Sequence, residues 1–164
     1  MRIGIAPFAA HKGKVYPLDK MEQVVKALSE QGLEIVLFGA GKAEQEILEN
    51  WEKKYPNVRS LANKQTLADD LQVMRSLQLM ITMDSGNMHL ASLVGTRVVS
   101  IWGATHPAMG FLGYGQSEID CIQSQLSCRP CSAYGNKPCR YGDYRCWNIA
   151  PEEIINYVMN TICK

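Results

Sequence analysis

The chain has 164 residues with ordinary proportions of apolar, charged and glycine residues, which is enough for one compact domain with a sizeable core. Its formal net charge of +1 gives no electrostatic argument for nucleic acid as a partner. No apolar run approaches the ~20 residues that cross a bilayer. The apolar stretch 3–10 is interrupted by Pro7 and is too short for a signal peptide. We therefore expect a cytoplasmic protein without a transmembrane segment.

Short apolar runs alternate with helical patterns along the chain. Runs typical of buried strands lie at residues 3–6, 34–38, 58–61, 79–82, 97–102 and 121–123. Apolar residues at helical spacing lie at residues 18–32, 42–54, 66–77, 90–94 and 151–163. Thr66 is expected to cap the third helix, with Asp69 in the capping-box position. Without an internal repeat or a linker, the alternation predicts an α/β fold with one doubly wound parallel sheet.

The stretch Asp84-Ser85-Gly86-Asn87-Met88-His89 lies where a buried strand turns into a helix. In a parallel sheet this place is the carboxyl edge, where ligands bind. The N–H groups at a helix start favour an anionic group such as phosphate, and Gly86 lacks a Cβ that would keep a ligand away. The structural alternative is that Asp84 or Ser85 only caps the helix and that His89 packs beneath it.

Two other loops are expected at the same sheet edge. Lys12 and Lys14 follow the first strand, where a lysine meets a phosphate as a point charge; a solvated loop is the alternative. The turn Gly39-Ala40-Gly41 after the second strand does not complete a dinucleotide-binding fingerprint. Glu44, just inside the next helix, either accepts hydrogen bonds from a ribose or is favoured there by the helix dipole.

Six cysteines are many for a cytosolic domain, and four of them crowd into residues 128–146. Clustered cytosolic cysteines are more often metal ligands than disulfides. The four cysteines therefore predict a structural zinc site that cross-links this loop; buried free thiols and disulfides are the alternatives. They form two pairs, Cys128-x2-Cys131 and Cys139-x6-Cys146.

The same loop interleaves basic and aromatic residues. Its basic residues are Arg129, Lys137, Arg140 and Arg145. This pattern suits nucleic acid, an acidic lipid or sugar, or a solvated rim. Because the chain as a whole is close to neutral, we do not expect nucleic acid as a partner.

Taken together, these residues resemble glycosyltransferase family 9, the lipopolysaccharide heptosyltransferase family. Asp84-Ser85-Gly86-x-x-His89-Leu90-Ala91 is similar to that family's D-[ST]-G-x-x-H-[IL]-A motif. Lys14 with Tyr16-Pro17 is similar to its lysine followed by an aromatic-proline pair, and residues 101–107 to its apolar-aromatic-G-x-T-x-P loop. The resemblance covers nearly the whole chain but only the C-terminal half of the family's usual chain.

The resemblance implies a bacterial two-domain GT-B transferase of lipopolysaccharide biosynthesis. Residues 1–164 would be its Rossmann-like C-terminal domain, including a Cys-rich loop at 121–148 and a C-terminal helix at 151–163. That domain binds a nucleotide-diphosphate sugar, typically ADP-heptose, and requires no cofactor apart from the candidate structural zinc. The N-terminal domain, expected to be absent here, binds the acidic lipid-sugar acceptor and supplies the general base.

The donor-site residues implied by the resemblance are Lys14, Glu44, Asp84, Ser85, Gly86, Asn87, His89 and Thr105. Lys14 would contact the diphosphate, and Asp84 and His89 would position the sugar-diphosphate. Ser85, Gly86 and Asn87 would offer hydrogen-bond donors at the helix start. Ala9-Ala10 stand where the family often has Ser or Thr, which removes a hydroxyl contact to phosphate.

We expect the chain to bind donor but to transfer sugar poorly or not at all, and the full protein to associate with the membrane only at its surface. The alternative is a nucleotide-binding module, or a zinc-stabilised interaction module, without transferase activity.

Overall fold

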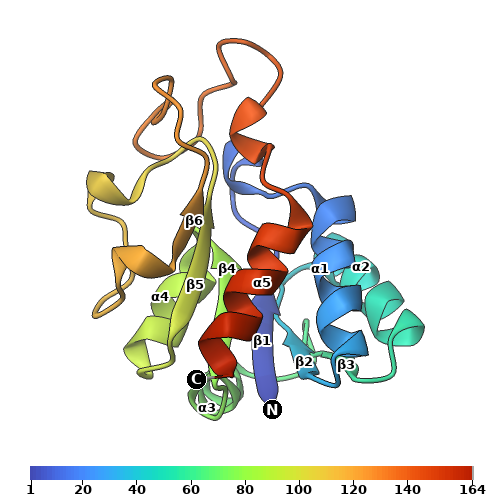
Figure 1. The fold of residues 1–164 in the computed structure, drawn as a ribbon. Coiled ribbons are helices and arrows are strands. Elements are labelled where there is room, and N and C mark those ends of the chain that lie inside the picture. Colours follow the sequence, from blue (N-terminus) through green and yellow to red (C-terminus); the bar gives the residue numbers. More distant parts are fainter. Residues whose placement is uncertain (164) are drawn as a thin grey trace.

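The computed structural model describes residues 1–163 and contains a six-stranded, entirely parallel sheet in the order β3-β2-β1-β4-β5-β6 (Figure 1). The strands are β1 (Arg2–Ala6), β2 (Glu34–Leu37), β3 (Val58–Ser60), β4 (Leu79–Met83), β5 (Val98–Trp102) and β6 (Cys121–Gln123). The helices are α1 (Leu18–Glu30), α2 (Lys42–Lys54), α3 (Leu67–Arg75), α4 (Gly86–Leu93) and α5 (Pro151–Ile162). The predicted α/β fold with a doubly wound parallel sheet is therefore confirmed.

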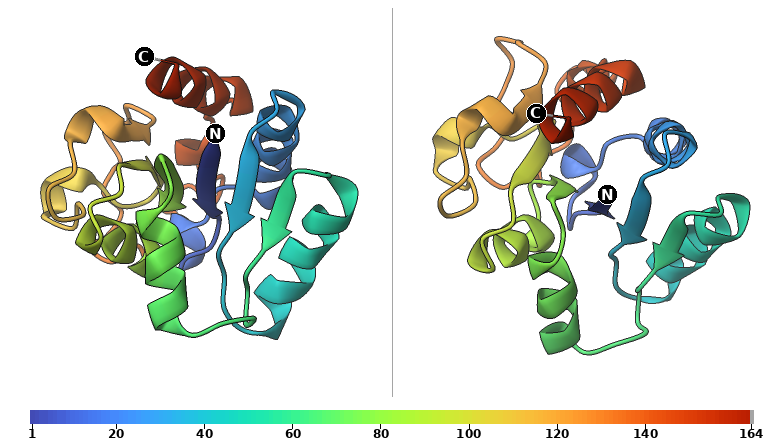
Figure 2. Two further views of the ribbon diagram at one scale, coloured as in Figure 1. Left: turned by 90° about the horizontal axis from the view of Figure 1, so that it is seen from below. Right: turned by 60° about the horizontal axis from the view of Figure 1, so that its bottom comes forward.

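Side chains of each strand alternate between two apolar cores. On β1, Ile3 and Ile5 belong to one core and Ala6 to the other. On β2, Ile35 lies on the first side and Val36 on the second. Helices α1, α2 and α5 cover the first core, and α3 and α4 the second (Figures 1 and 2). Because both faces of the sheet are covered, the strands are continuous apolar runs in the sequence.

Local sequence explains where α3 begins. The Thr66 hydroxyl accepts a hydrogen bond from the Asp69 N–H at 3.3 Å, and the Asp69 carboxylate accepts one from the Thr66 N–H at 3.1 Å. The predicted capping box is therefore confirmed. The helix that it starts is shorter than predicted, since α3 ends at Arg75, and Leu67 is 57% exposed despite its helical spacing.

The Cys-rich loop lies over the carboxyl ends of the strands (Figure 1, top). Within residues 124–148 the only regular element is one turn of 3-10 helix at Arg145–Trp147. After this loop, α5 packs beside α1. No helix of the described chain, residues 1–163, is both long enough and apolar enough to cross a membrane.

An ion pair anchors the far end of α5 to the sheet. Two N–H groups of Arg97 donate to the Asp120 carboxylate at 2.9 and 2.7 Å, and the Tyr157 hydroxyl donates to it at 2.6 Å. Burial raises the pKa of Asp120, but these hydrogen bonds outweigh burial, and the net pKa is below its ordinary value. The carboxylate therefore remains charged and holds α5 beside β6.

Candidate functional site

A pocket opens at the carboxyl edge of the sheet, where the connections that follow β1 and β4 leave toward opposite faces. Its volume is about 280 Å³, and it is lined by Phe8, Ala9, Ala10, Ala40, Glu44, Ser85, Gly86, Asn87 and Leu90. These residues come from the loops after β1, β2 and β4. This is the switch point of a doubly wound sheet, at which ligands bind. Four of the predicted site residues thus meet in one pocket.

The first turn of α4 faces this pocket without a side-chain cap. Ser85 is the N-cap residue in extended conformation, yet its side chain makes no capping hydrogen bond. Its hydroxyl oxygen lies instead 3.1 Å from that of Thr82. A Cβ added to Gly86 would meet no atom within 4 Å. The first N–H groups of a helix have no partner within the helix, so the amides of Gly86 and Asn87 are left for a ligand or for solvent.

Lys14 and Asp84 form a buried ion pair beside the pocket. The Lys14 ammonium lies 2.9 Å from Asp84 Oδ2, and the two side chains are 16% and 4% exposed. Apart from this pair, Oδ2 has no hydrogen-bond partner among residues 1–163. Two charges removed from water are stable only when their geometry and remaining hydrogen bonds are good. An anion that binds to the Lys14 ammonium must therefore either displace the Asp84 carboxylate or share the ammonium with it.

The sequence-based alternative that Ser85 caps α4 is wrong, because its side chain makes no capping hydrogen bond. The Asp84 side chain pairs with Lys14 instead. His89 does not pack beneath α4 either; its side chain is exposed, and it does not line the pocket.

Glu44 has a structural role that the sequence left open. One of its carboxylate oxygens accepts a hydrogen bond from the Ala40 N–H at 2.8 Å, across the turn that leads into α2. A Cβ at Gly39 would lie 3.0 Å from the same oxygen and 2.9 Å from a methyl carbon of Leu48, so a larger residue there would displace one of these two side chains. Glu44 thus closes the start of α2 and also lines the pocket.

Thr105 lies outside the pocket lining. Its residue is fully buried, and its hydroxyl oxygen has no hydrogen-bond partner among residues 1–163. The backbone around it contacts the Cys-rich loop, because the guanidinium of Arg129 donates to the Thr105 carbonyl at 2.8 Å. Arg129 is only 9% exposed, and burial lowers its pKa. Sequence reasoning missed this burial, since an arginine between two cysteines carries no local signal that separates a solvated side chain from a buried one.

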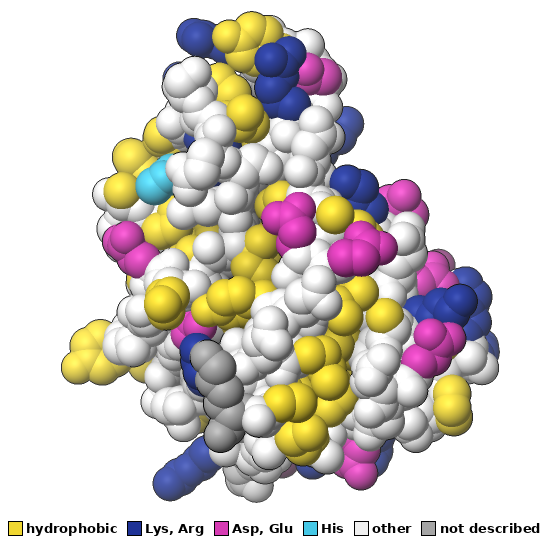
Figure 3. All heavy atoms as spheres, viewed as in Figure 1, with side chains coloured by type: hydrophobic (Ala, Val, Ile, Leu, Met, Phe, Trp, Pro, Cys, Tyr) yellow, Lys and Arg dark blue, Asp and Glu magenta, His cyan; other side chains and the backbone are white. Residues whose placement is uncertain are grey.

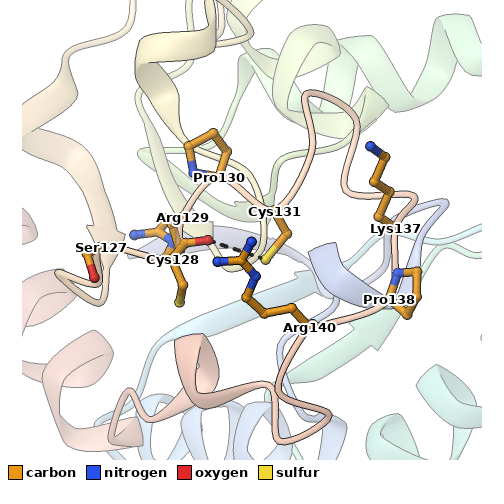
Figure 4. Close-up of a pocket in the computed structure, with 8 residues that line it drawn as sticks. All are labelled: Ser127, Cys128, Arg129, Pro130, Cys131, Lys137, Pro138 and Arg140. Atoms are coloured by element: carbon orange, nitrogen blue, oxygen red, sulfur yellow. Dashed lines mark hydrogen bonds between the residues drawn. The ribbon is translucent and has the colours of Figure 1, made fainter.

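The four predicted metal ligands lie in one loop but do not converge on a point. All are free thiols, and no three His, Cys, Asp or Glu side chains of the described residues form a group that would hold a metal ion. Burial and, to a smaller extent, the nearby Cys131 thiol together raise the pKa of Cys146 to about 11. The Cys131 thiol donates to the Cys128 carbonyl at 3.7 Å, beside a pocket of about 420 Å³ (Figure 4).

Basic and apolar side chains gather over this part of the molecule (Figure 3, top). The guanidinium of Arg145 lies 4.5 Å from the Tyr141 ring centroid and pairs with Asp143 at 2.7 Å. Lys137 and Arg140 line the pocket beside Cys128 and Cys131. These exposed basic side chains are compatible with two of the alternatives from the sequence, namely contact with an acidic lipid or sugar, or a solvated rim.

Known proteins share this sequence and fold. The chain is 31% identical over 137 residues to lipooligosaccharide heptosyltransferase 2 of Campylobacter jejuni, in an alignment that covers 80% of this chain and 42% of that protein. The chain thus spans less than half the length of this curated relative.

Two solved structures share the fold over 99% of this chain. The E. coli ADP-heptose lipopolysaccharide heptosyltransferase II matches with a TM-score of 0.76 at 19% identity, over 46% of its own chain. The dodecameric iron-containing heptosyltransferase TibC, in complex with ADP-D-beta-D-heptose, matches with a TM-score of 0.68 at 16% identity, over 45% of its chain. At these identities the likeness shows the fold alone.

The model of one protein family matches most of the chain. It describes glycosyltransferase family 9 (heptosyltransferase) and matches residues 1–142. Together with the C. jejuni relative, this match agrees with the motif at Asp84–Ala91 and with the pocket that the motif lines. The chain belongs to glycosyltransferase family 9.

Proposed function

We propose that the chain is the donor-binding part of a glycosyltransferase that transfers a heptose, or a related sugar, from a nucleotide-diphosphate sugar to a lipopolysaccharide-type acceptor. The observation that carries the proposal is the pocket at the sheet switch point, with the open first turn of α4 on one side. The Lys14–Asp84 pair lies at the start of the same turn. The ADP-heptose in the TibC structure supports the same class of ligand.

The pocket suggests how the donor lies. The diphosphate would accept hydrogen bonds from the amides of Gly86 and Asn87 and meet the ammonium of Lys14. Glu44 keeps one carboxylate oxygen that makes no hydrogen bond to Ala40, and it would accept from a ribose hydroxyl. Ala9 and Ala10 line the pocket without a hydroxyl, so this part of the wall adds contact but no donor.

Glycosyl transfer leaves negative charge on the departing nucleotide diphosphate. Preorganised donors at the start of α4 and the Lys14 ammonium would stabilise this charge as it develops. The exposed His89, one turn further along α4, would reach the sugar-diphosphate from the open side.

A general base is needed to deprotonate the acceptor hydroxyl. Within residues 1–163, the two carboxylates near the pocket have other roles in this proposal: Asp84 pairs with Lys14, and Glu44 bonds to the Ala40 N–H and is assigned to the ribose. In our proposal the base therefore comes from an acceptor-binding half, at the cytoplasmic surface of the membrane where a lipid acceptor is available. The chain by itself would bind donor and turn it over slowly or not at all.

Substituting Gly86→Ala tests the donor site without disturbing the fold. The added Cβ meets no protein atom within 4 Å, so we expect the free energy of unfolding to stay within about 0.5 kcal/mol of wild type. A diphosphate against the first turn of α4 would meet this methyl group. We expect the affinity for ADP, measured by calorimetry, to fall about tenfold, which corresponds to about 1.4 kcal/mol.

Two results would contradict the proposal. If folded wild-type protein does not bind ADP at millimolar concentration, the donor site is wrong and the interaction module without transferase activity becomes the better interpretation. If Gly86→Ala binds ADP as tightly as wild type does, the diphosphate does not lie at this helix start.

We further propose that a metal ion orders the Cys-rich loop through Cys128, Cys131, Cys139 and Cys146. Four thiols in a loop with a single helical turn support this, although they do not converge in the structure. The cysteine pattern in the sequence suggested zinc. Thiolates also bind iron, and TibC contains iron, so iron is a second candidate for the metal.

Elemental analysis of reduced, unchelated protein is expected to find about one equivalent of zinc or iron, since a four-thiolate site holds one ion. Cys131→Ser should lose the metal, whereas the matched variant Cys163→Ser, at an exposed cysteine outside the loop, should keep it. Less than about a tenth of an equivalent in wild type would rule out a resident ion at the affinities of structural sites.

A further inference from the structure

Arg129 is a buried cation held almost entirely by backbone carbonyls. None of the ion pairs among residues 1–163 includes it. Its guanidinium donates to the carbonyls of Trp102 at 3.1 Å and Thr105 at 2.8 Å, and also to those of Gly103 and Ser124. Burial of a charge is costly unless its hydrogen bonds are made. The position of the guanidinium and the positions of these carbonyls therefore depend on each other.

The segment that leaves β5, residues 102–105, is called the β5 exit. Three of its carbonyls, those of Trp102, Gly103 and Thr105, accept from Arg129. The remaining carbonyl of the β5 exit, that of Ala104, accepts a hydrogen bond from the Cys131 N–H at 2.7 Å. Four successive carbonyls, at residues 102–105, are thus held by Arg129 or by the amide two residues after it. The exit of β5 takes its shape from the Cys-rich loop.

The exit of β5 in turn holds the loop that carries Lys14. The Ala104 N–H donates to the Gly13 carbonyl at 2.8 Å. A Cβ at Gly135, in the Cys-rich loop, would lie 2.6 Å from Lys14 Cγ and 3.2 Å from Thr105 Cγ2. The Lys14 stem therefore runs between the β5 exit and the Cys-rich loop before its ammonium reaches Asp84.

We propose that Arg129 is a positioning residue for the donor diphosphate, acting through the β5 exit and Gly13 on Lys14. This inference rests on the proposed function. Arg129 does not touch the donor; it sets where the Lys14 ammonium stands. Only a planar guanidinium has donors that fan out to several carbonyls at once, so a lysine at this position holds fewer of them. The Cys-rich loop is then a structural part of the donor site.

The test compares ADP with adenosine, which lacks the diphosphate. Arg129→Met is expected to weaken ADP binding about tenfold or more, because small displacements of a positioning group are costly, while adenosine binding stays unchanged. Arg129→Lys should recover part of the ADP affinity. The matched control is Arg145→Met, on the same loop with a side chain 47% exposed, which should bind both ligands as wild type does.

A second variant reaches the same contact from the other side. Gly135→Ala forces a methyl group against the Lys14 stem, and its φ of +69° also disfavours any residue but glycine. We expect the same selective loss of ADP, which tests the contact of the Cys-rich loop with Lys14. If Arg129→Met does not fold, Arg129→Lys decides whether Arg129 has the proposed role. Equal losses of ADP and adenosine, or unchanged ADP binding, would overturn the inference.

A measurement without ligand separates this inference from the proposed function. In NMR spectra of the free protein, Arg129→Met should shift the amide resonances of Gly13, Lys14 and Ala104, and Arg145→Met should not. If wild type fails to bind ADP, the proposed function fails while these shifts still report the coupling of Arg129 to Lys14. Unshifted resonances in a folded Arg129→Met protein would overturn the coupling itself.

Discussion

Lys14→Met is expected to weaken ADP binding by about 10- to 100-fold, because a hydrogen bond to a charged group contributes about 1.5–3 kcal/mol. Lys14 is the cation beside the start of α4, and its ammonium is held 2.9 Å from Asp84 Oδ2. The matched control is Lys12→Met. Lys12 lies in the same loop, and its ammonium stands 5.2 Å from the centre of the Tyr144 ring. Titration calorimetry with ADP measures both variants.

The same substitution also affects stability, and the two effects are separable. Without Lys14, the carboxylate of Asp84 is left buried and unpaired, which costs about 3 kcal/mol of unfolding free energy. The double variant Lys14→Met/Asp84→Asn removes this charge and should regain much of the stability. Its ADP affinity should remain low, because the cation is still missing. If Lys14→Met binds ADP as tightly as Lys12→Met does, Lys14 has no role in holding the diphosphate.

Gly103→Ala is expected to lower the free energy of unfolding by about 3 kcal/mol, the upper part of the range for overpacking a core. A Cβ at this position would overlap the indole ring of Trp147, which is 5% exposed and belongs to the core beneath α1 and α5. The ring is rigid and enclosed, so the backbone must move. Urea denaturation followed by circular dichroism measures the change.

Gly86→Ala serves as the matched control for this substitution, because its Cβ meets nothing within 4 Å. Gly103 also gives its carbonyl to Arg129, so a shift of its backbone should disturb the β5 exit. A change in unfolding free energy of less than about 0.5 kcal/mol for Gly103→Ala would mean that Trp147 does not pack against Gly103 in solution.

The fold was predictable because its signals are local. Apolar runs bounded by turn residues marked each strand, and the second helix has the predicted bounds, Lys42–Lys54. Thr66 and Asp69, three residues apart, form the whole capping box with their own side chains and backbone N–H groups. The predicted helix at residues 66–77 was too long, because helical spacing marks an apolar stripe but not the residue at which the helix ends.

The sequence predicted where in the fold the candidate site lies, but not how its side chains are oriented. Residues after different strands were expected at one sheet edge because parallel strands all end there. That expectation brought Glu44 and Ser85 to one pocket. It did not decide whether His89 packs beneath the helix or faces a ligand. The side chain is exposed because of the way α4 packs against α3 and β4, which the sequence does not show.

The sequence by itself determined the class of fold, the family and the edge of the sheet at which the motif Asp84–Ala91 lies. Only the tertiary structure decided which group neutralises each buried charge. Lys14 and Asp84 are 70 positions apart and pair directly, while Arg129 finds carbonyls rather than a carboxylate. The physical reason is that burial and hydrogen bonding depend on atoms brought together from distant segments, whereas periodicity and capping depend on neighbours along the chain.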